Sequence, residues 1–333
     1  MPNTDFRLPA EWEPQSATLL AWPPPRSDWA DLLPGIRQEY VELIRAITRQ
    51  QPVVLLGAPV DDSAQHQLGD LPGLFMLEIA CDDTWCRDYG PITLINNKRR
   101  LALDFHFNGW GGKYPAARDN RANTLLARHG AHIAPLAGLR FDQVLFELEG
   151  GAIECDGQGS LLINWHCLHQ RHPHLTRDEI DYELRTHLGV ERVLGIDLEP
   201  LPGDDTDGHI DTLARFLGSD LIAWQEQPAA ARSGRLQAQL KALQSSHGQP
   251  YRLLELPKPE GVDPILPANY VNFLFINNAC LVPAYGVAAD AQARQRLQQA
   301  LPERKVESVP SAILIEQYGG PHCASMHIPA APS

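Results

Sequence analysis

The sequence predicts an α/β fold in which five β/α units surround a central axis, a five-bladed α/β propeller. Strand-turn-strand patterns recur about every 60 residues, and an amphipathic helical pattern lies between successive turns. A steady spacing of this kind is typical of propellers and solenoids. A generic α/β protein with accidental spacing is the alternative. The four turns are centred on Asn96-Asn97, Asp156-Gly157, Gly218-Ser219 and Asn277-Asn278.

Five helices are expected, each bounded by a Pro, Gly, Asp or Thr that starts or ends helical structure. They cover residues 36–48, 116–128, 177–188, 236–243 and 291–301. A short apolar run follows each helix and is predicted to join the sheet of the same unit. These runs are residues 52–56, 131–134, 190–194, 253–256 and 305–309.

Five helices meet only four internal hairpins, and a fifth hairpin could be assembled from the two ends of the chain. Residues 324–328 are expected to pair with residues 17–22, which removes the open sheet edges that invite aggregation. The sequence thus predicts that residues 1–333 form a single domain closed by pairing of the chain ends.

Composition narrows the classes of partner. The 333 residues carry a net charge of −13, which argues against nucleic acid and anionic membranes and favours a small cationic substrate. The N-terminus lacks a basic region followed by an apolar one, so a cytoplasmic protein is expected. Six cysteines without a paired C-x-x-C motif indicate reduced thiols and no zinc-finger site.

The most polar stretch is Gly203-Asp204-Asp205-Thr206-Asp207-Gly208-His209-Ile210-Asp211. If the chain is extended after Gly208, the period of two places His209 and Asp211 on one face. Residues 213–217 and 221–224 then read as two strands of a hairpin, although the apolar positions also fit a helix. An acidic surface turn with a chance histidine is the alternative for the whole stretch.

Polar residues stand at equivalent places, just ahead of successive hairpins. Asp88 precedes the first turn, Glu149 the second, His209 and Asp211 the third, and Cys323 the closing strand. In a ring of units these residues converge at one end of the axis. Together they offer a nucleophile, an acid/base and carboxylates for a cation.

Each of these residues also has a structural interpretation. Cys323 could be a small buried hydrophobe, Asp88 could pair with Arg87, and Glu149 could cap a turn. A metal site made of His209, Asp211 and Cys323 is a weaker alternative, because the thiolate lacks a second soft ligand. A metal site is therefore not the expected interpretation of these residues.

Several motifs, in order along the whole chain, resemble the agmatine deiminase / peptidyl-arginine deiminase-like family of guanidino-group-modifying enzymes, the penteins. They are Trp85-x-Arg87-Asp88-x-Gly90-Pro91, Asn108-x-Trp110-Gly111-Gly112, Glu149-Gly150-Gly151, Thr206-x-Gly208-His209-x-Asp211 and Gly320-x-His322-Cys323, with Leu8-Pro9-Ala10-Glu11-Trp12-Glu13-Pro14 and Tyr270-Val271-Asn272-Phe273. The resemblance implies a five-bladed α/β propeller and a single catalytic domain. It implies hydrolysis of a guanidinium to a ureido group and ammonia, without a cofactor.

The resemblance also implies residue roles. Cys323 would attack the guanidinium carbon and form a covalent thiouronium, with His209 as the acid/base and Glu149 orienting His209. Asp88 and Asp211 would hold the guanidinium nitrogens. Trp110 suits the alkyl chain of a small guanidine, with core packing as the alternative. Asp205 is a candidate partner for a distal amine, or it holds its loop.

The substrate implied first is agmatine, which would give N-carbamoylputrescine. Free or peptidyl arginine stays open, because Arg87 or Arg171 could bind a carboxylate if they face the pocket. An amidinotransferase of the same fold, a non-catalytic polyamine-binding protein and a homodimer are further alternatives. Pro321 before the His-Cys pair, Asp207 in place of a common Asn, and Cys167-Leu168-His169-Gln170-Arg171-His172-Pro173 in place of an Asn-rich loop depart from the family pattern.

Overall fold

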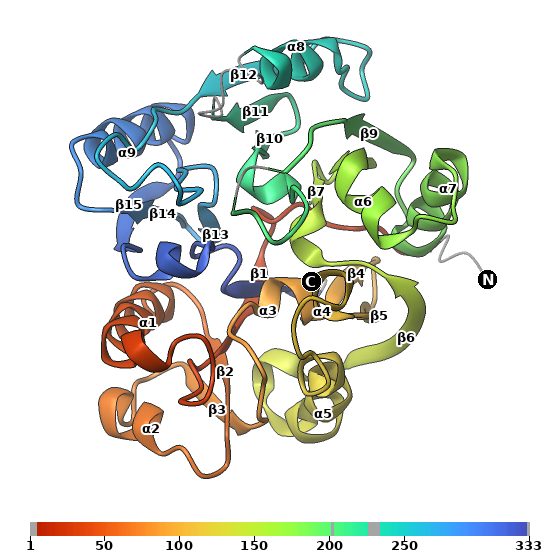
Figure 1. The fold of residues 1–333 in the computed structure, drawn as a ribbon. Helices are drawn as coiled ribbons and strands as arrows, with labels where there is room; N and C mark the ends of the chain where they lie inside the picture. The colour runs from red at the N-terminus through yellow and green to blue at the C-terminus, as the bar shows by residue number, and fades with distance from the viewer. Residues whose placement is uncertain (1–4, 201–202, 226–233, 332–333) are drawn as a thin grey trace.

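Five small β-sheets follow one another around a common axis (Figure 1). The computed structural model describes residues 5–200, 203–225 and 234–331. Each sheet combines an antiparallel hairpin with a strand that joins it in parallel. A parallel pair needs a long crossover, which explains why a helical segment leads to each parallel strand. The five-bladed α/β propeller predicted from the sequence is confirmed.

The blades take their strands in chain order, except that the first blade includes the last strand of the chain. The first blade contains β16 (Ser325–Pro329), β1 (Gln15–Ala21), β2 (Val53–Gly57) and β3 (Leu74–Glu78). The second contains β4 (Ile92–Ile95), β5 (Arg100–His106) and β6 (Leu139–Glu147). The third contains β7 (Ile153–Cys155), β8 (Ser160–Asn164) and β9 (Arg192–Ile196). The fourth contains β10 (Ala214–Gly218), β11 (Leu221–Trp224) and β12 (Arg252–Glu255). The fifth contains β13 (Leu274–Ile276), β14 (Ala279–Ala284) and β15 (Lys305–Pro310).

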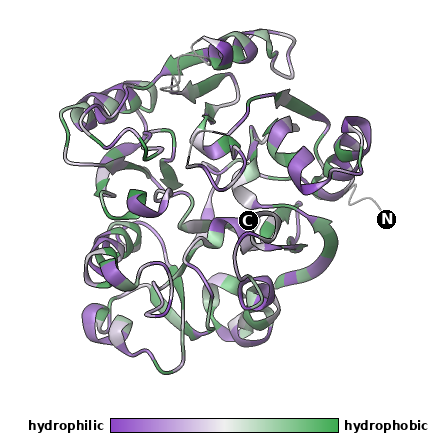
Figure 2. Ribbon diagram, viewed as in Figure 1, coloured by the Kyte–Doolittle hydropathy of each residue, from purple (hydrophilic) through white to green (hydrophobic). Residues whose placement is uncertain are grey.

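The chain ends pair as the sequence predicts. β1 runs antiparallel to β16, with Ala17 opposite Ile328 and Leu20 opposite Ser325, and parallel to β2 on its other side. This pairing closes the ring and leaves β1 fully covered, with Leu19 and Leu20 at 0% exposure. Apolar residues follow the strands toward the axis, whereas the peripheral helices carry the polar surface (Figure 2).

The longer helices are α1 (Leu33–Thr48), α2 (Ser63–Leu68), α5 (Ala122–His129), α6 (Trp165–Arg171), α7 (Arg177–Leu188), α8 (Arg235–Ala242) and α9 (Ala289–Ala300). Most of them lie on the outside of the ring, whereas α6 lies further in, between β7 and α7 (Figure 1). In α7 the Thr176 side chain and Glu179 form a capping box, and Gly189 ends the helix at φ 64°. None of the helices described is both long and apolar enough to cross a membrane.

Two local predictions are wrong. Residues 131–134 are not a strand: Gly130–His132 and Ala134–Leu136 are 3-10 turns, and β6 begins only at Leu139. Pro135 lacks a backbone donor, and Gly138 reverses the chain at φ 72° just before the strand. The helix expected from residue 116 begins at Ala122, after another 3-10 turn.

Candidate active site

One pocket opens near the axis, and several of the residues expected at the site line it. These are Asp88, Trp110, Asp205, His209 and Cys323. Asp88 lies on the short helix α3 (Cys86–Tyr89), and Cys323 directly precedes β16. The turns ahead of successive blades thus bring these side chains together, as the order of the chain predicts.

Asp88 is buried in the lining of the pocket and has two fixed donors. Trp110 Nε1 donates to its Oδ2 at 2.9 Å, and the Gly151 N–H donates to its Oδ1 at 3.0 Å. Burial raises the pKa of Asp88, and the charges of Asp211 and Glu149 raise it further, while His209 opposes them. Asp88 would therefore stabilise a bound substrate cation in addition to the charge of His209.

Gly151 makes this convergence sterically feasible. A Cβ at this position would lie 2.5 Å from His209 Nδ1 and 2.8 Å from Asp88 Oδ1, closer than a real side chain tolerates. The motif Glu149-Gly150-Gly151 therefore has a physical reason: a side chain here would push the imidazole and the carboxylate apart.

His209 is held between two carboxylates. Its Nδ1 lies 3.6 Å from Asp88 Oδ1, and its Nε2 lies 3.5 Å from Glu149 Oε2. Burial alone would lower the pKa of His209, but the negative charge of Asp88 and the Glu149 carboxylate outweigh it and raise the pKa well above its ordinary value. The imidazole is therefore an imidazolium in the free site.

The prediction that the chain is extended after Gly208 is wrong. Residues Ile210–Thr212 form a 3-10 turn, so the period of two does not apply. The turn is held because Thr206 Oγ1 accepts from the His209 N–H at 3.1 Å and Thr212 Oγ1 donates to the His209 carbonyl at 2.9 Å. His209 and Asp211 nevertheless both lie beside Gly151.

Glu149 is ionised although it is buried. Burial raises its pKa, but His209 and Arg171 outweigh burial, so the pKa of Glu149 is lowered. Arg171 Nε donates to Glu149 Oε1 at 2.6 Å, and Arg171 also pairs with Asp207 at 2.6 Å. Arg171 therefore holds Glu149 in place and does not line the pocket.

Asp211 is positioned by a histidine to which the sequence prediction gave no role. His322 Nδ1 lies 2.7 Å from Asp211 Oδ2, and His322 Nε2 lies 2.8 Å from Glu11 Oε2. Burial raises the pKa of Asp211, yet His322 reverses the effect and keeps it low. The other oxygen, Oδ1, is buried without a hydrogen-bond partner in the part of the chain that the structure describes.

Cys323 has its sulfur beside this carboxylate, 3.5 Å from Asp211 Oδ2. Asn272 Nδ2 donates to Sγ at 3.0 Å, and Asn272 Oδ1 accepts from the Cys323 N–H at 3.3 Å. Burial and the charges of Asp211 and Asp88 raise the pKa of Cys323 well above its ordinary value. The free site therefore holds a thiol. Asn272 belongs to one of the motifs shared with the family, but no role was predicted for it from the sequence. Its contacts show that it holds Cys323.

The pocket lining is acidic. Asp28, Asp83, Asp204 and Asp205 line it together with Asp88, and Tyr114 donates its hydroxyl to Asp205 Oδ2 at 2.6 Å. No Lys or Arg is present among the described residues that line it. Trp110 lines the pocket and also packs edge-on against Phe107 at 5.0 Å, so its packing and pocket-facing interpretations both hold.

Arg87, an alternative binding residue in the sequence, and the neighbouring Cys86 do not line the pocket. Arg87 pairs with Glu11 at 3.1 Å and donates to the His322 carbonyl, so it is not placed to bind a substrate. Cys86 lies on helix α3, and its sulfur contacts the Leu19 and Ala324 carbonyls.

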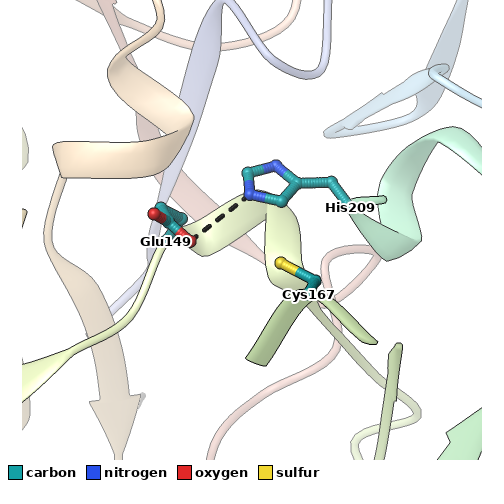
Figure 3. A group of neighbouring side chains, drawn as sticks. All are labelled: Glu149, Cys167 and His209. Atoms are coloured by element: carbon teal, nitrogen blue, oxygen red, sulfur yellow. Dashed lines mark ion pairs between the residues drawn. The ribbon is translucent and has the colours of Figure 1, made fainter. Parts of the chain in front are cut away.

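A metal set of His209, Asp211 and Cys323 is not what the geometry brings together. Among the described residues, ligand atoms within 4.8 Å of one another belong to Glu149, Cys167 and His209 (Figure 3).

Known proteins resemble this chain over nearly its whole length. An agmatine deiminase of Pseudomonas aeruginosa is 33% identical over 99% of this chain and 97% of the relative. A crystal structure described as a putative arginine deiminase from Porphyromonas gingivalis is 39% identical, covers 97% of this chain and 98% of its own, and has a TM-score of 0.88. A Cys-to-Ser variant of the C. jejuni agmatine deiminase with substrate bound is 32% identical, covers 98% and 97%, and has a TM-score of 0.89.

The family model described as Porphyromonas-type peptidyl-arginine deiminase matches residues 7–329. With the fold, the order of the motifs and these relatives, the match shows that the chain belongs to the Porphyromonas-type peptidyl-arginine deiminase family.

Proposed function

We propose that this chain is a hydrolase of linear amidines that deiminates agmatine, giving N-carbamoylputrescine and ammonia. One observation carries the proposal: the Cys323 thiol and the buried Asp88 carboxylate line one pocket, whose described lining has five aspartates and no Lys or Arg. Such a pocket favours a substrate that is cationic at both ends. The agmatine deiminases among the relatives support the same substrate.

Asp88 and Asp211 are proposed to hold the guanidinium. A planar cation pairs well with carboxylates that each present oxygens in its plane, and Asp211 Oδ1 is a buried acceptor without a hydrogen-bond partner among the described residues. Held in this way, the guanidinium carbon would lie close to Cys323 Sγ, and this positioning lowers the entropic part of the barrier.

Cys323 and His209 are proposed to carry out the chemistry. The bound cation favours the thiolate, and the thiol proton passes to solvent. The thiolate adds to the guanidinium carbon, the His209 imidazolium protonates the departing nitrogen, and ammonia leaves a cationic thiouronium on Cys323. Neutral His209 then takes a proton from water, which adds to the same carbon, and the C–S bond breaks to release the ureido product. Glu149 orients His209 and stabilises its charged form.

Asp205 is proposed to bind the distal ammonium, since it lines the pocket. A free arginine would bring a carboxylate to the same place, and Arg87 and Arg171, the two candidates for binding it, are both used in ion pairs. All proposed residues belong to one chain, so a homodimer is not required for the chemistry. The six cysteines are free, which fits a reducing compartment such as the cytoplasm.

A substrate panel tests this proposal. Agmatine, free arginine and an arginine peptide are each incubated with the protein, and the ureido product and ammonia are measured with and without an added amine acceptor. We expect the highest kcat/KM for agmatine, with one ammonia released per ureido group. Comparable turnover of the peptide would contradict agmatine as the substrate, and amidine transfer to the acceptor without ammonia release would indicate an amidinotransferase. Binding of agmatine without turnover would leave only a polyamine-binding protein.

A further inference from the structure

A second thiol lies beside the imidazole of the site. Cys167 comes from α6, Glu149 from the turn after β6 and His209 from the turn before Ile210–Thr212. The sulfur and the carboxylate face the same edge of the imidazole ring (Figure 3). All three side chains are buried, and one ligand atom from each lies within 4.8 Å of the other two.

Two of these three atoms lack hydrogen bonds. His209 Nε2 and Glu149 Oε2 form an ion pair at 3.5 Å, but both atoms are buried and neither makes a hydrogen bond in the ranges that the structure describes. Two ligands at about 2.0 Å from a tetrahedral zinc ion are separated by roughly 3.3 Å. The existing separation therefore suits a shared metal ion without movement of the backbone.

The surroundings already orient both ligands. Arg171 binds the other oxygen of Glu149 at 2.6 Å and leaves Oε2 directed at the imidazole. On the far side of the ring, Asp88 Oδ1 lies 3.6 Å from His209 Nδ1. A carboxylate behind a metal-binding histidine is a frequent arrangement, because it fixes the ring and raises its basicity.

We propose that Glu149, Cys167 and His209 form an inhibitory site for a thiophilic divalent cation such as Zn²⁺. Thiolate, imidazole and carboxylate are ligands that Zn²⁺ prefers, and one thiolate with one carboxylate balances its charge. Binding displaces one proton from the Cys167 thiol and one from the His209 imidazolium. These side chains supply three ligands, and a water molecule would be the fourth ligand of a tetrahedral ion.

Inhibition follows if His209 has the role given under the proposed function, on which this part of the inference rests. A metal ion on Nε2 occupies the position of the second proton of the imidazolium. With its lone pair bound to the metal, Nε2 can no longer take part in proton transfer. Metal binding itself does not depend on that role, so it is measured separately from turnover.

Cobalt(II) is the probe for binding, because a cobalt–thiolate bond absorbs in the near ultraviolet. The full-length protein is freed of metal with a chelator and titrated with Co²⁺, then with Zn²⁺ as competitor. Three chains are compared: wild type, Cys167→Ser and Cys323→Ser. We expect one Co²⁺ with a thiolate band in wild type and in Cys323→Ser. The band should be absent in Cys167→Ser, which loses only the soft ligand.

Turnover of agmatine provides the second readout. Zn²⁺ should inhibit the wild type reversibly, with recovery on addition of chelator. Cys167→Ser should still turn over but require at least roughly 10- to 100-fold more Zn²⁺ for half-inhibition, because even the loss of a residue that only orients a metal ligand costs that much affinity. A band that persists in Cys167→Ser, or disappears in Cys323→Ser, would move the metal to the nucleophile and overturn the proposal. Absence of the cobalt–thiolate band from the folded wild-type protein would also overturn the proposal, regardless of the spectra of the two variants. Cobalt binding without any agmatine turnover would instead leave the site standing and refute the proposed function.

Discussion

Two groups of buried charges lie back to back near the axis, and they use the same residue types differently. Behind the site, Glu11 and Glu154 face Arg87 and Arg215 in ion pairs of 2.6 to 3.1 Å. In the site, carboxylates outnumber the cations, and oxygens of Asp211 and Glu149 lack hydrogen-bond partners among the described residues. Burying such groups is unfavourable unless a cation compensates them.

The two groups should therefore contribute to different properties of the protein. The rear carboxylates are neutralised by the protein itself, so they should contribute to stability. The carboxylates of the site are left for a cationic ligand, so they should contribute to binding and turnover. His322 joins the two groups, because its ring contacts Asp211 on one side and Glu11 on the other.

The largest effect should come from the nucleophile. Cys323→Ser should reduce kcat by at least about 10⁴-fold, as the loss of a covalent nucleophile does in hydrolases, because an alkoxide is far harder to form near neutral pH than a thiolate. Cys280→Ser is the matched control, since Cys280 is also buried but lies away from the pocket. Single-turnover rates with agmatine measure both variants, and substantial activity in Cys323→Ser would exclude it as the nucleophile.

A rear carboxylate should behave in the opposite way. Glu154→Gln leaves Arg215 with less compensating charge, so we expect a loss of about 3–5 kcal/mol in the free energy of unfolding. The kcat/KM of the folded protein should stay close to that of wild type. Urea unfolding measures the predicted loss of stability, and agmatine kinetics at a temperature where the variant is folded measure kcat/KM. An unchanged stability with impaired kinetics would reverse our assignment of the two groups.

The substrate-holding carboxylates should show binding effects without loss of fold. Asp88→Asn and Asp211→Asn keep the shape but remove one charge, and the loss of one partner from a desolvated charge pair costs about 2–5 kcal/mol, roughly 30-fold to several-thousand-fold in kcat/KM. Asp104→Asn is the control, because Asp104 is buried against Asn123 outside the pocket. Wild-type kinetics in either site variant would remove that residue from the site.

Asp119 extends the comparison to a carboxylate that contacts neither an arginine nor the pocket. It accepts the Asp82 and Asp83 N–H groups, and its Oδ2 is buried without a hydrogen-bond partner among the described residues. Burial raises the pKa of Asp119 to about 8. The folded state therefore binds this proton more tightly than the unfolded state, and the stabilisation is complete below about pH 4 and is lost as the pH rises through about 8.

Asp119→Asn should accordingly make stability less dependent on pH. Relative to the wild type, the variant should gain stability steadily between pH 4 and 8. Thermal unfolding across that range measures the difference. Parallel curves for the two proteins would show that Asp119 is ionised in the folded state.

Local patterns predicted most of the fold but only part of the site. The four internal hairpins, the pairing of β1 with β16 and helix α7 follow from periodicity, turn residues and caps. The strand predicted at residues 131–134 is wrong because four apolar residues in a row do not distinguish a strand from 3-10 turns. His209 and Asp211 meet through a 3-10 turn and a glycine on another blade, a long-range contact that no local pattern contains.

The contacts of Asn272 and His322 could not be predicted for a similar reason. Both residues stand in motifs that mark the family, yet their roles depend on partners 51 residues away for Asn272 with Cys323 and 311 residues away for His322 with Glu11. The position of Cys167 beside Glu149 and His209 is likewise a product of packing. The sequence presents it only as one residue of a loop that departs from the family pattern.

Trapping the covalent intermediate tests the central claim most directly. Wild-type protein is quenched with acid during agmatine turnover, digested and mapped by mass spectrometry at each of the six cysteines. We predict a thiouronium adduct on Cys323 alone, with increased accumulation in a His209→Ala variant if water activation slows more than attack. An adduct on Cys86 or Cys167, or full turnover with no adduct on any cysteine, would contradict the account.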